Sequence, residues 1–502
     1  MSPQPAAHDV ELVVVDREQV VAEVPCDVLV VGVQPGEDRT PGLDPRSADL
    51  LGDVVAFIDV VDPETEPVHL VPPPAGLAAR ALALVRVPDD APRLAGLAGA
   101  AASAMRGVSA FANVVLALPA TTPQELEAVV RGALLGVHRQ TGRLPVVGPV
   151  PTGRTVHVRH TVEESATGTA VERARIVADA VTGARDLVDR PPNLLTPRDF
   201  AAAAEVVGGA HGLTVEVWDA RRVRGAGLGG LAGVGQGSGN PPRLVVVRHR
   251  PPRPRAHVAL VGKGVTFDSG GLNLKPTSEL ASMKIDMAGA AAVFQACVAA
   301  ARLELDVAVT AWLPLAENSV SGTSIRPGDV LTLRDGRRVE VRNTDLEGRL
   351  LLADALTLAR EEKPDLIVDV ATLTDAQVMA LGTRISALMS NDDPLRALLL
   401  EAAAEADEGL WPMPLPIHLR RALASQVADI ANEGERSATM LTAGIFLQEF
   451  ASPASQRTRW AHLDICGTAY NHGAPYSVVP QGATGVPVQT LINFLRAVAL
   501  DS

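Results

Sequence analysis

A glycine-rich segment that follows an apolar run carries an unusual concentration of charged side chains. Residues 261–287 read VGKGVTFDSGGLNLKPTSELASMKIDM and contain Lys263, Asp268, Lys275 and Asp286. Ionised side chains are rarely buried in a protein core unless they are paired or bind a metal ion. The segment is therefore a poor candidate for core structure and a good candidate for a catalytic or metal site.

A second acidic cluster, NTDLEGR at residues 343–349, follows the strand-like run Arg338–Val341. If this cluster is extended, its alternate residues Asp345 and Glu347 face the same side of the chain. Two divalent cations that share ligands need bridging oxygen atoms, and carboxylates supply them. The two clusters, each at the end of a predicted strand, therefore predict a cage of carboxylates for two metal ions.

At these residues the chain resembles the leucyl aminopeptidase family, the cytosol aminopeptidases that include bacterial aminopeptidase A. The resemblance extends from about residue 180 to residue 500. It is carried by DLVDRPPNLLTP, GVGQGSGNPPRL, VGKGVTFDSGG, NTDLEGRLLLADAL, DVATLT, WAHLDICGTA and GATG. Members of this family use two metal ions to release N-terminal amino acids from peptides, so the resemblance implies the same activity here.

The resemblance also implies which side chains hold the metal ions. Two divalent ions, zinc or manganese, would be bound by Lys263, Asp268, Asp286, Asp345 and Glu347. Asp268 and Glu347 would bridge the ions. A lysine ligand is unusual, but an ammonium group loses its proton readily beside dications in a desolvated site. Magnesium and cobalt are also compatible with such ligands.

Two basic residues complete the site that the resemblance implies. Lys275 would stay charged and stabilise the oxyanion of the tetrahedral intermediate formed by attack of a metal-bridging hydroxide. Arg349 would hold a bicarbonate ion that acts as the general base, because its planar fork suits such an anion. The alternative is that Lys275 and Arg349 only neutralise the acidic cage. Peptides with a free N-terminus would be the substrates, since the α-amine would bind one metal ion.

The chain departs from the family pattern at two positions. Leu346 stands where NTDxEGR usually has Ala, and we expect altered packing with intact metal binding. Asp375 follows TLT where Gly is usual, in a turn that, with Met283, borders the pocket for the first side chain of the substrate in relatives. A carboxylate there predicts a preference for Lys or Arg, or it points to solvent. The change also puts the backbone in question if that turn needs a positive φ.

Two further residues, His462 and Cys466 in WAHLDICG, have side chains that can bind metals. Two such ligands without partners in a motif are more typical of packing and hydrogen bonding. We therefore do not include them in the predicted metal site.

Composition limits the partners that this chain can have. The 502 residues carry a formal charge of −13, and acidic residues outnumber basic ones in the first 165. This charge disfavours nucleic acid and anionic membranes as partners. Three widely spaced cysteines argue against a disulfide framework. The N-terminus shows no signal peptide pattern. The expected location is the cytoplasm.

Alternating strand-like and helix-like runs predict an α/β fold throughout the chain. We expect a smaller N-terminal α/β domain at residues 1–165, a linking helix at 166–190 and a catalytic domain at 191–502. Nearly continuous apolar strands, such as Val258–Val261 and Leu366–Ala371, predict a mixed, mostly parallel central sheet with helices on both faces. The resemblance further implies a homohexamer.

Other functions remain open at this point. A dipeptide or Cys-Gly hydrolase would use the same metal cage, so only its substrates would distinguish it. A non-catalytic protein on the same scaffold, including a DNA-associated form, would be favoured by a missing ligand. All the ligands that the family motifs require are present.

Overall fold

The computed structural model describes residues 10–15, 20–34, 40, 43–55, 68–87, 93–138 and 154–500. The first nine residues, which belong to the N-terminal stretch without a signal peptide pattern, lie outside the described residues. The chain forms two compact units, residues up to 182 with 473–480, and residues 183–472 with those from 481 onward. The division falls inside helix α4 (Glu164–Asp189), the helix predicted to link two domains. The predicted limits at residues 165 and 191 stay a prediction.

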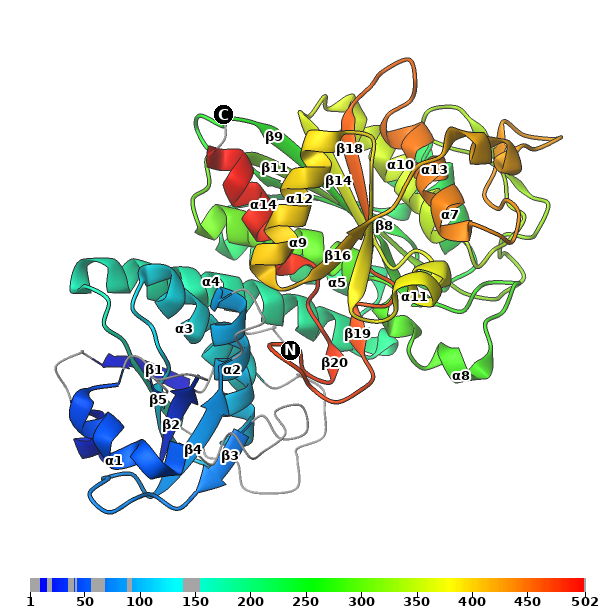
Figure 1. The fold of residues 1–502 in the computed structure, drawn as a ribbon. Coiled ribbons are helices and arrows are strands. Elements are labelled where there is room, and N and C mark those ends of the chain that lie inside the picture. The colour runs from blue at the N-terminus through cyan, green and yellow to red at the C-terminus, as the bar shows by residue number, and fades with distance from the viewer. Residues whose placement is uncertain are drawn as a thin grey trace. The chain divides into compact units, whose positions relative to one another are not determined.

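The N-terminal unit is a six-stranded sheet with helices, as predicted for an α/β fold. Its strand order is β1-β6-β5-β2-β4-β3, and only β3 runs antiparallel to its neighbour. The strands are β1 (Val10–Val15), β2 (Val28–Val33), β3 (Val68–Val71), β4 (Ala81–Arg86), β5 (Asn113–Ala117) and β6 (Arg154–Arg159). The helices are α1 (Pro45–Val55), α2 (Arg93–Gly107) and α3 (Pro123–Val137) (Figure 1).

The C-terminal unit is built on a nine-stranded mixed sheet. Its order is β16-β15-β18-β14-β9-β11-β8-β7, and β10 pairs with the end of β11. The strands are β7 (Thr214–Trp218), β8 (Arg243–His249), β9 (His257–Gly262), β10 (Gly264–Asp268), β11 (Ala308–Asn318), β14 (Leu366–Ala371), β15 (Ile385–Ser390), β16 (Gly409–Pro412) and β18 (Arg459–Asp464). The central strands β9, β11, β14 and β18 are parallel to one another. The predicted mixed, mostly parallel sheet is confirmed.

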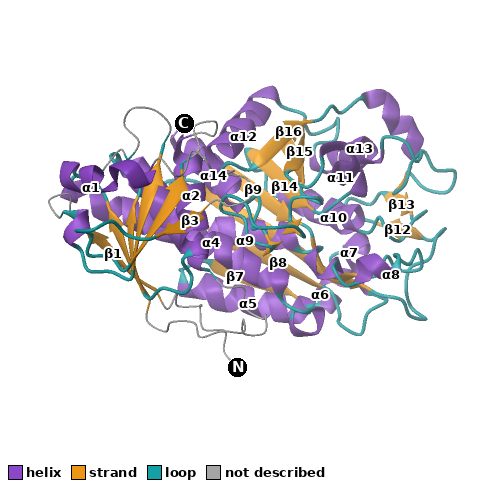
Figure 2. Cartoon of the chain, turned by 60° about the horizontal axis from the view of Figure 1, so that its bottom comes forward, coloured by secondary structure: helices purple, strands orange, loops and turns teal. Residues whose placement is uncertain are grey.

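Helices cover both faces of this central sheet. One face carries α7 (Gly229–Gly235), α10 (Gly348–Glu361) and α13 (Thr439–Ala451), and the other carries α5 (Pro197–Ala210), α9 (Ala288–Arg302), α12 (Asp393–Ala406) and α14 (Val488–Leu500) (Figures 1 and 2). Every residue of β14 is buried, which is why its residues other than Asp369 are apolar without alternation. The two layers of helices fix the sheet, whose strand ends hold the charged clusters.

Shorter elements complete the C-terminal unit. They are the helices α6 (Ala220–Gly225), α8 (Thr277–Leu280) and α11 (Asp375–Leu381), and the strands β12 (Val330–Thr332), β13 (Arg338–Glu340), β17 (Ile430–Ala431), β19 (Tyr470–Asn471) and β20 (Gly482–Ala483). Strand β13 leads into the NTDLEGR cluster, as the sequence predicted.

One apolar helical stretch, Met283–Arg302, meets the length and composition of a membrane span, and it contains α9. Within the described residues it is the one such stretch, and 83% of it is buried inside the protein. Its apolar side chains contact the central sheet, so it has the surroundings of a core helix.

Candidate metal centre

Lys263 lies at the junction of β9 and β10 and is almost completely buried, with 4% of its surface exposed. Its Nζ atom is 2.7 Å from Asp286 Oδ1 and 2.8 Å from Glu347 Oε1. It also donates to the carbonyl oxygen of Thr372 at 2.9 Å. Burial alone would lower the pKa of Lys263, but attraction to Asp286 and Glu347 outweighs it and raises the pKa. Without a metal ion, this ammonium group is the counter-charge of the carboxylates.

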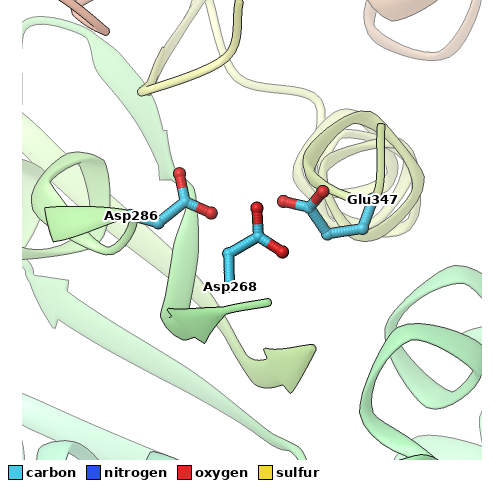
Figure 3. A group of neighbouring side chains, drawn as sticks. All are labelled: Asp268, Asp286 and Glu347. Carbon is cyan, nitrogen blue, oxygen red and sulfur yellow. The ribbon is translucent and has the colours of Figure 1, made fainter. Parts of the chain in front are cut away.

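Three carboxylates converge beside Lys263. Asp268, Asp286 and Glu347 each offer an oxygen within 4.8 Å of the others, and all three are buried. Figure 3 shows their carboxyl groups directed toward one space, with Glu347 coming from the start of α10. Burial raises the pKa of Asp268 and of Asp286. For Glu347 the attraction of Lys263 and Lys275 outweighs the effect of burial and lowers the pKa.

Lys275 and Asp345 extend this cluster on the side of Asp268. Lys275 Nζ is 3.0 Å from Asp268 Oδ2 and 2.6 Å from Asp345 Oδ1. Burial, together with the charge of Asp268, raises the pKa of Asp345 to about 7. Burial lowers the pKa of Lys275, but attraction to Asp268 and to the other carboxylates raises it overall. Asp345 lies outside the group of three mutually close carboxylates.

The prediction that Asp345 and Glu347 face the same side of an extended segment is wrong. Residues 344 and 345 form a turn, and Glu347 has helical dihedral angles (φ −73°, ψ −34°) at the start of α10. The segment is therefore not extended, and alternation does not aim these side chains. A turn followed at once by a helix places both carboxylates near Asp268 instead.

Two positive-φ glycines let the chain reverse directly after Asp268. Gly270 has φ +84° and Gly271 has φ +67°, a region that glycine adopts without strain. Gly348 serves packing rather than turning, because a β-carbon there would lie 2.5 Å from Lys263 Cε. Gly348 thus allows helix α10 to approach Lys263 closely.

Asparagine and threonine side chains that the sequence did not single out orient the two clusters. Asn318, at the end of β11, donates from Nδ2 to Asp268 Oδ1 at 2.8 Å and to the carbonyl oxygen of Thr344 at 3.1 Å. Thr344 Oγ1 donates to the carbonyl oxygen of Gly270 at 2.7 Å. Thr372 Oγ1 donates to Asp286 Oδ1 at 2.7 Å. For Asn318 and Thr372, the position at the carboxyl end of a central strand was the available signal.

Arg349 lies in the first turn of α10 and is 1% exposed. Its Nη1 atom donates to the carbonyl oxygen of Asn432 at 2.8 Å. Its Nε and Nη2 atoms have no hydrogen-bond partner among the described residues. Burial lowers the pKa of Arg349 to about 10. A buried guanidinium with two free donors fits a small planar anion.

The donor set also fits divalent cations. Buried carboxylate oxygens dominate it, and Asp286 Oδ2 lacks a hydrogen-bond partner in the described part of the chain. The two ammonium groups of Lys263 and Lys275 neutralise a cage that would otherwise hold several buried negative charges, and divalent cations would supply the same charge. The five predicted ligands therefore suit metal ions of the kind that the resemblance implies.

The charged cluster borders a cavity of about 680 Å³, lined by Lys263, Asp268, Lys275, Asp286 and Asp345. Its wall is formed by apolar and polar residues from five segments: Glu279, Met283, Ile285, Asn343, Leu346, Thr372, Leu373, Thr374, Asp375, Ala376, Met379, Ala380, Glu433, Arg436, Thr439 and Cys466. Both departures from the family pattern, Leu346 and Asp375, line this cavity. Asp375 is the first residue of α11, and Thr374 caps that helix. Asp375 does not have a positive φ, so the aspartate is accommodated here without backbone strain.

The chain is similar to known proteins, and their family is consistent with a metal site of this kind. Residues 182–492 match the catalytic domain of the cytosol aminopeptidase family. A probable cytosol aminopeptidase of Streptomyces griseus subsp. griseus is 45% identical over 504 residues, which cover 95% of this chain and 97% of that protein. One of Streptomyces avermitilis is 48% identical over 415 residues, 82% of this chain and 80% of that protein.

Among solved structures, the bottromycin maturation enzyme BotP in complex with Mn superposes with a TM-score of 0.81 at 38% identity. The match covers 94% of this chain and 100% of BotP. Fold, sequence and the acidic site at the strand ends thus agree, and the chain belongs to the cytosol aminopeptidase family of metal-dependent peptidases.

Proposed function

We propose that this protein is a two-metal aminopeptidase that releases N-terminal residues from peptides with a free α-amine. The observation that carries the proposal is the buried group of Asp268, Asp286 and Glu347, flanked by two lysines. Asp268, Asp286 and both lysines line one cavity. A single buried carboxylate would need no such arrangement. Three buried carboxylates, whose oxygens either lack hydrogen-bond partners or are ion-paired with lysine, favour the binding of cations.

The ligands would divide between two ions. Lys263, Asp268, Asp286 and Glu347 would hold one, and Asp268, Asp345 and Glu347 the other, with zinc or manganese as the metal. When bound, the ions would supply an acidified water and a Lewis acid for the substrate carbonyl. Lys263 would bind only as the neutral amine, so it must lose the proton that it now shares with Asp286 and Glu347.

Metal binding should therefore depend on pH. Burial raises the pKa of Asp345 to about 7 and raises those of Asp268 and Asp286. Below its pKa the Asp345 carboxyl group holds a proton that an incoming cation must displace, and the raised pKa of Asp268 and of Asp286 acts in the same direction. We therefore expect the affinity for metal to fall as the pH drops below neutrality. Calorimetric titration with Mn²⁺ on either side of neutrality, in two buffers of different ionisation enthalpy, measures affinity and proton release together. Equal affinity without proton release would contradict this.

The two basic residues would act on the reaction itself. Lys275 keeps its proton because Asp268 and Asp345 raise its pKa, so its ammonium group would stabilise the oxyanion that forms from the substrate carbonyl. Arg349 would hold bicarbonate, the general base that the resemblance implies, through Nε and Nη2. Asn432 fixes the guanidinium through Nη1 and leaves those two donors available.

Several broader properties belong to the same proposal. Residues 191–502 would form the catalytic domain, and the protein would act in the cytosol as a homohexamer, without nucleic acid as a partner. The matched residues 182–492 support the catalytic domain, and the name of the relatives and the free cysteines in the described structure support the cytosol. The formal charge of −13 disfavours nucleic acid, and the homohexamer follows from the family resemblance alone.

The test compares Leu p-nitroanilide with N-acetyl-Leu p-nitroanilide, each with metal-free and metal-loaded protein. We expect hydrolysis only of the free-amine substrate and only with metal, because an acylated amine cannot bind a cation. Equal cleavage of both substrates would assign the site to another class of amidohydrolase. Cleavage restricted to dipeptides or Cys-Gly would favour the narrower hydrolase.

Asp375 should bias the substrate's first side chain toward lysine and arginine. The cavity combines apolar side chains, among them Met283 and Leu346, with this exposed carboxylate, a pattern that suits an aliphatic stem with a cationic end. We expect Asp375→Gly to shift the Lys-to-Leu ratio of kcat/KM toward Leu by roughly twofold to fivefold, the size of an exposed ion pair. Asp375→Asn is the control, because it removes the charge but keeps a polar side chain at the first position of α11. Equal or better hydrolysis of Leu in the wild type, unchanged in Asp375→Gly, would refute the preference.

A further inference from the structure

His462 on β18 is a fully buried histidine with one unpartnered ring nitrogen. Its Nδ1 atom lies 2.6 Å from Asp369 Oδ1, and the other oxygen of Asp369 accepts a hydrogen bond from Trp460 Nε1 at 2.7 Å. The carboxylate is an acceptor, so Nδ1 carries a proton. Nε2 meets no partner within the described residues, although His462 is 0% exposed. A buried polar atom of this kind calls for an explanation.

The strand register shows which face of the sheet holds this histidine. Asp369 and His462 are direct partners on the parallel strands β14 and β18, between the pairs Ile367–Trp460 and Ala371–Asp464. Side chains two residues apart on a strand share a face. Ile367, Ala371 and Trp460 pack in one core with the leucines of α10. His462 therefore lies on the face that α10 covers.

Asp464 does not satisfy the free nitrogen. This carboxylate accepts hydrogen bonds from the backbone N–H groups of Leu373 at 3.1 Å and Cys466 at 3.2 Å, and from Thr374 Oγ1 at 2.7 Å. It is thus committed to the turn that follows β14, at the edge of the cavity.

Helix α10 brings Arg349 to the same face. Arg349 is buried, and two of its nitrogen atoms also lack partners in the described structure. His462 lies close enough to Arg349 and Asp464 for both charges to affect its pKa. Burial lowers that pKa, but attraction to Asp369 outweighs it and raises the pKa of His462. Asp369 is a fully buried carboxylate 2.6 Å from the ring, and an opposite charge at that distance favours the imidazolium form, in which Nε2 is a donor.

We propose that His462, paired with Asp369, is a positioning residue of the Arg349 anion site, where its positive charge and free Nε2–H strengthen the binding of the small anion. The inference rests on the proposed function, in which Arg349 holds bicarbonate. The charged groups that face the imidazole are Asp369 from β14, Asp464 from β18 and Arg349 from α10. An anion would supply the hydrogen-bonded counter-charge that Arg349 lacks among the described residues.

The experiment measures anion binding rather than turnover. The melting temperature of metal-loaded protein is followed as sodium bicarbonate replaces sodium chloride at fixed pH and ionic strength, since a ligand of the folded state raises it by mass action. We expect a saturating rise for the wild type and none for Arg349→Ala. In His462→Gln the midpoint should move to at least about tenfold higher bicarbonate, the effect of losing a charged hydrogen-bond donor.

Two further variants separate this role from a structural one. Asp369→Asn should shift the midpoint in the same direction, because the imidazole loses the counter-charge that keeps it protonated, and it decides the matter if His462→Gln does not fold. Trp460→Phe removes the other donor to Asp369 and should lower the melting temperature with the midpoint within about twofold of the wild type.

The outcomes separate the role of His462 from the existence of the Arg349 anion site. A wild-type midpoint in both His462→Gln and Asp369→Asn overturns the role of His462 and leaves the Arg349 site intact. A shift in Trp460→Phe as large as in His462→Gln assigns the effect to packing and also overturns it. A wild-type protein that does not respond to bicarbonate overturns the anion site and this inference with it.

Discussion

Glu347→Gln should remove metal binding and lower kcat/KM by roughly a thousandfold or more, because metal catalysis contributes several kcal/mol and each 1.36 kcal/mol is tenfold in rate. Glu347 is 1% exposed and starts α10, with Oε1 2.8 Å from Lys263 Nζ. Glutamine keeps the shape of the side chain but lacks the charge that both ions would share. Metal content after dialysis and hydrolysis of Leu p-nitroanilide measure the two effects.

The control for Glu347→Gln lies on the same helix. Asp354 of α10 is also a buried carboxyl group, and its oxygens accept from the backbone N–H groups of Leu231 and Arg334. Burial raises its pKa to about 7. Asp354→Asn should therefore alter stability but leave metal content unchanged. If both variants lost their metal equally, the loss would reflect damage to α10. Full metal content and activity in Glu347→Gln would refute its role as a ligand.

Lys275→Ala should lower kcat by roughly a hundredfold to a thousandfold, the scale found for loss of one oxyanion donor. Lys275 reaches the cage from a loop, with its Nζ 3.0 Å from Asp268 and 2.6 Å from Asp345. Removing this ammonium group also removes a cation that would compete with the metal ions for these carboxylates. Metal content should therefore be kept, which separates this variant from Glu347→Gln. Single-turnover hydrolysis at saturating metal measures the chemical step.

A neighbouring lysine provides the comparison for Lys275. Lys284 donates to the carbonyl oxygen of Asp189 at 2.8 Å and is absent from the cavity wall. Lys284→Ala should leave kcat within a few fold of the wild type. Were Lys275→Ala to change KM alone, or Lys284→Ala to reduce kcat equally, the oxyanion role of Lys275 would be untenable.

Much of the fold could be predicted because its strands carry their own signal. A strand covered on both faces is mostly apolar, and the predicted runs Val258–Val261 and Leu366–Ala371 lie within β9 and β14. The small and apolar residues that follow Asp286 form the buried helix α9, Ala288–Arg302. Burial on a sheet flanked by helices leaves a pattern in a single segment, so neighbouring residues suffice to detect it.

The site could be predicted only in part. Charged residues among glycines at strand ends marked the two clusters, but the geometry assumed for residues 345–347 was wrong, since a turn and a helix start replace the expected extended chain. The side chains that orient the clusters come from distant segments. Asn318 is 50 residues from Asp268, and Asn432 is 83 residues from Arg349. No local pattern marks such partners, because only the folded sheet brings them together.

The most direct test of a two-metal aminopeptidase counts metal ions and activity in the same sample. Metal-free protein is titrated with Mn²⁺, and bound metal per chain and hydrolysis of Leu p-nitroanilide are measured at each step. We predict binding to saturate at two ions per chain, with activity rising to its maximum as the second site fills. Saturation at one ion with full activity, or two bound ions without hydrolysis of any free-amine substrate, would contradict the account.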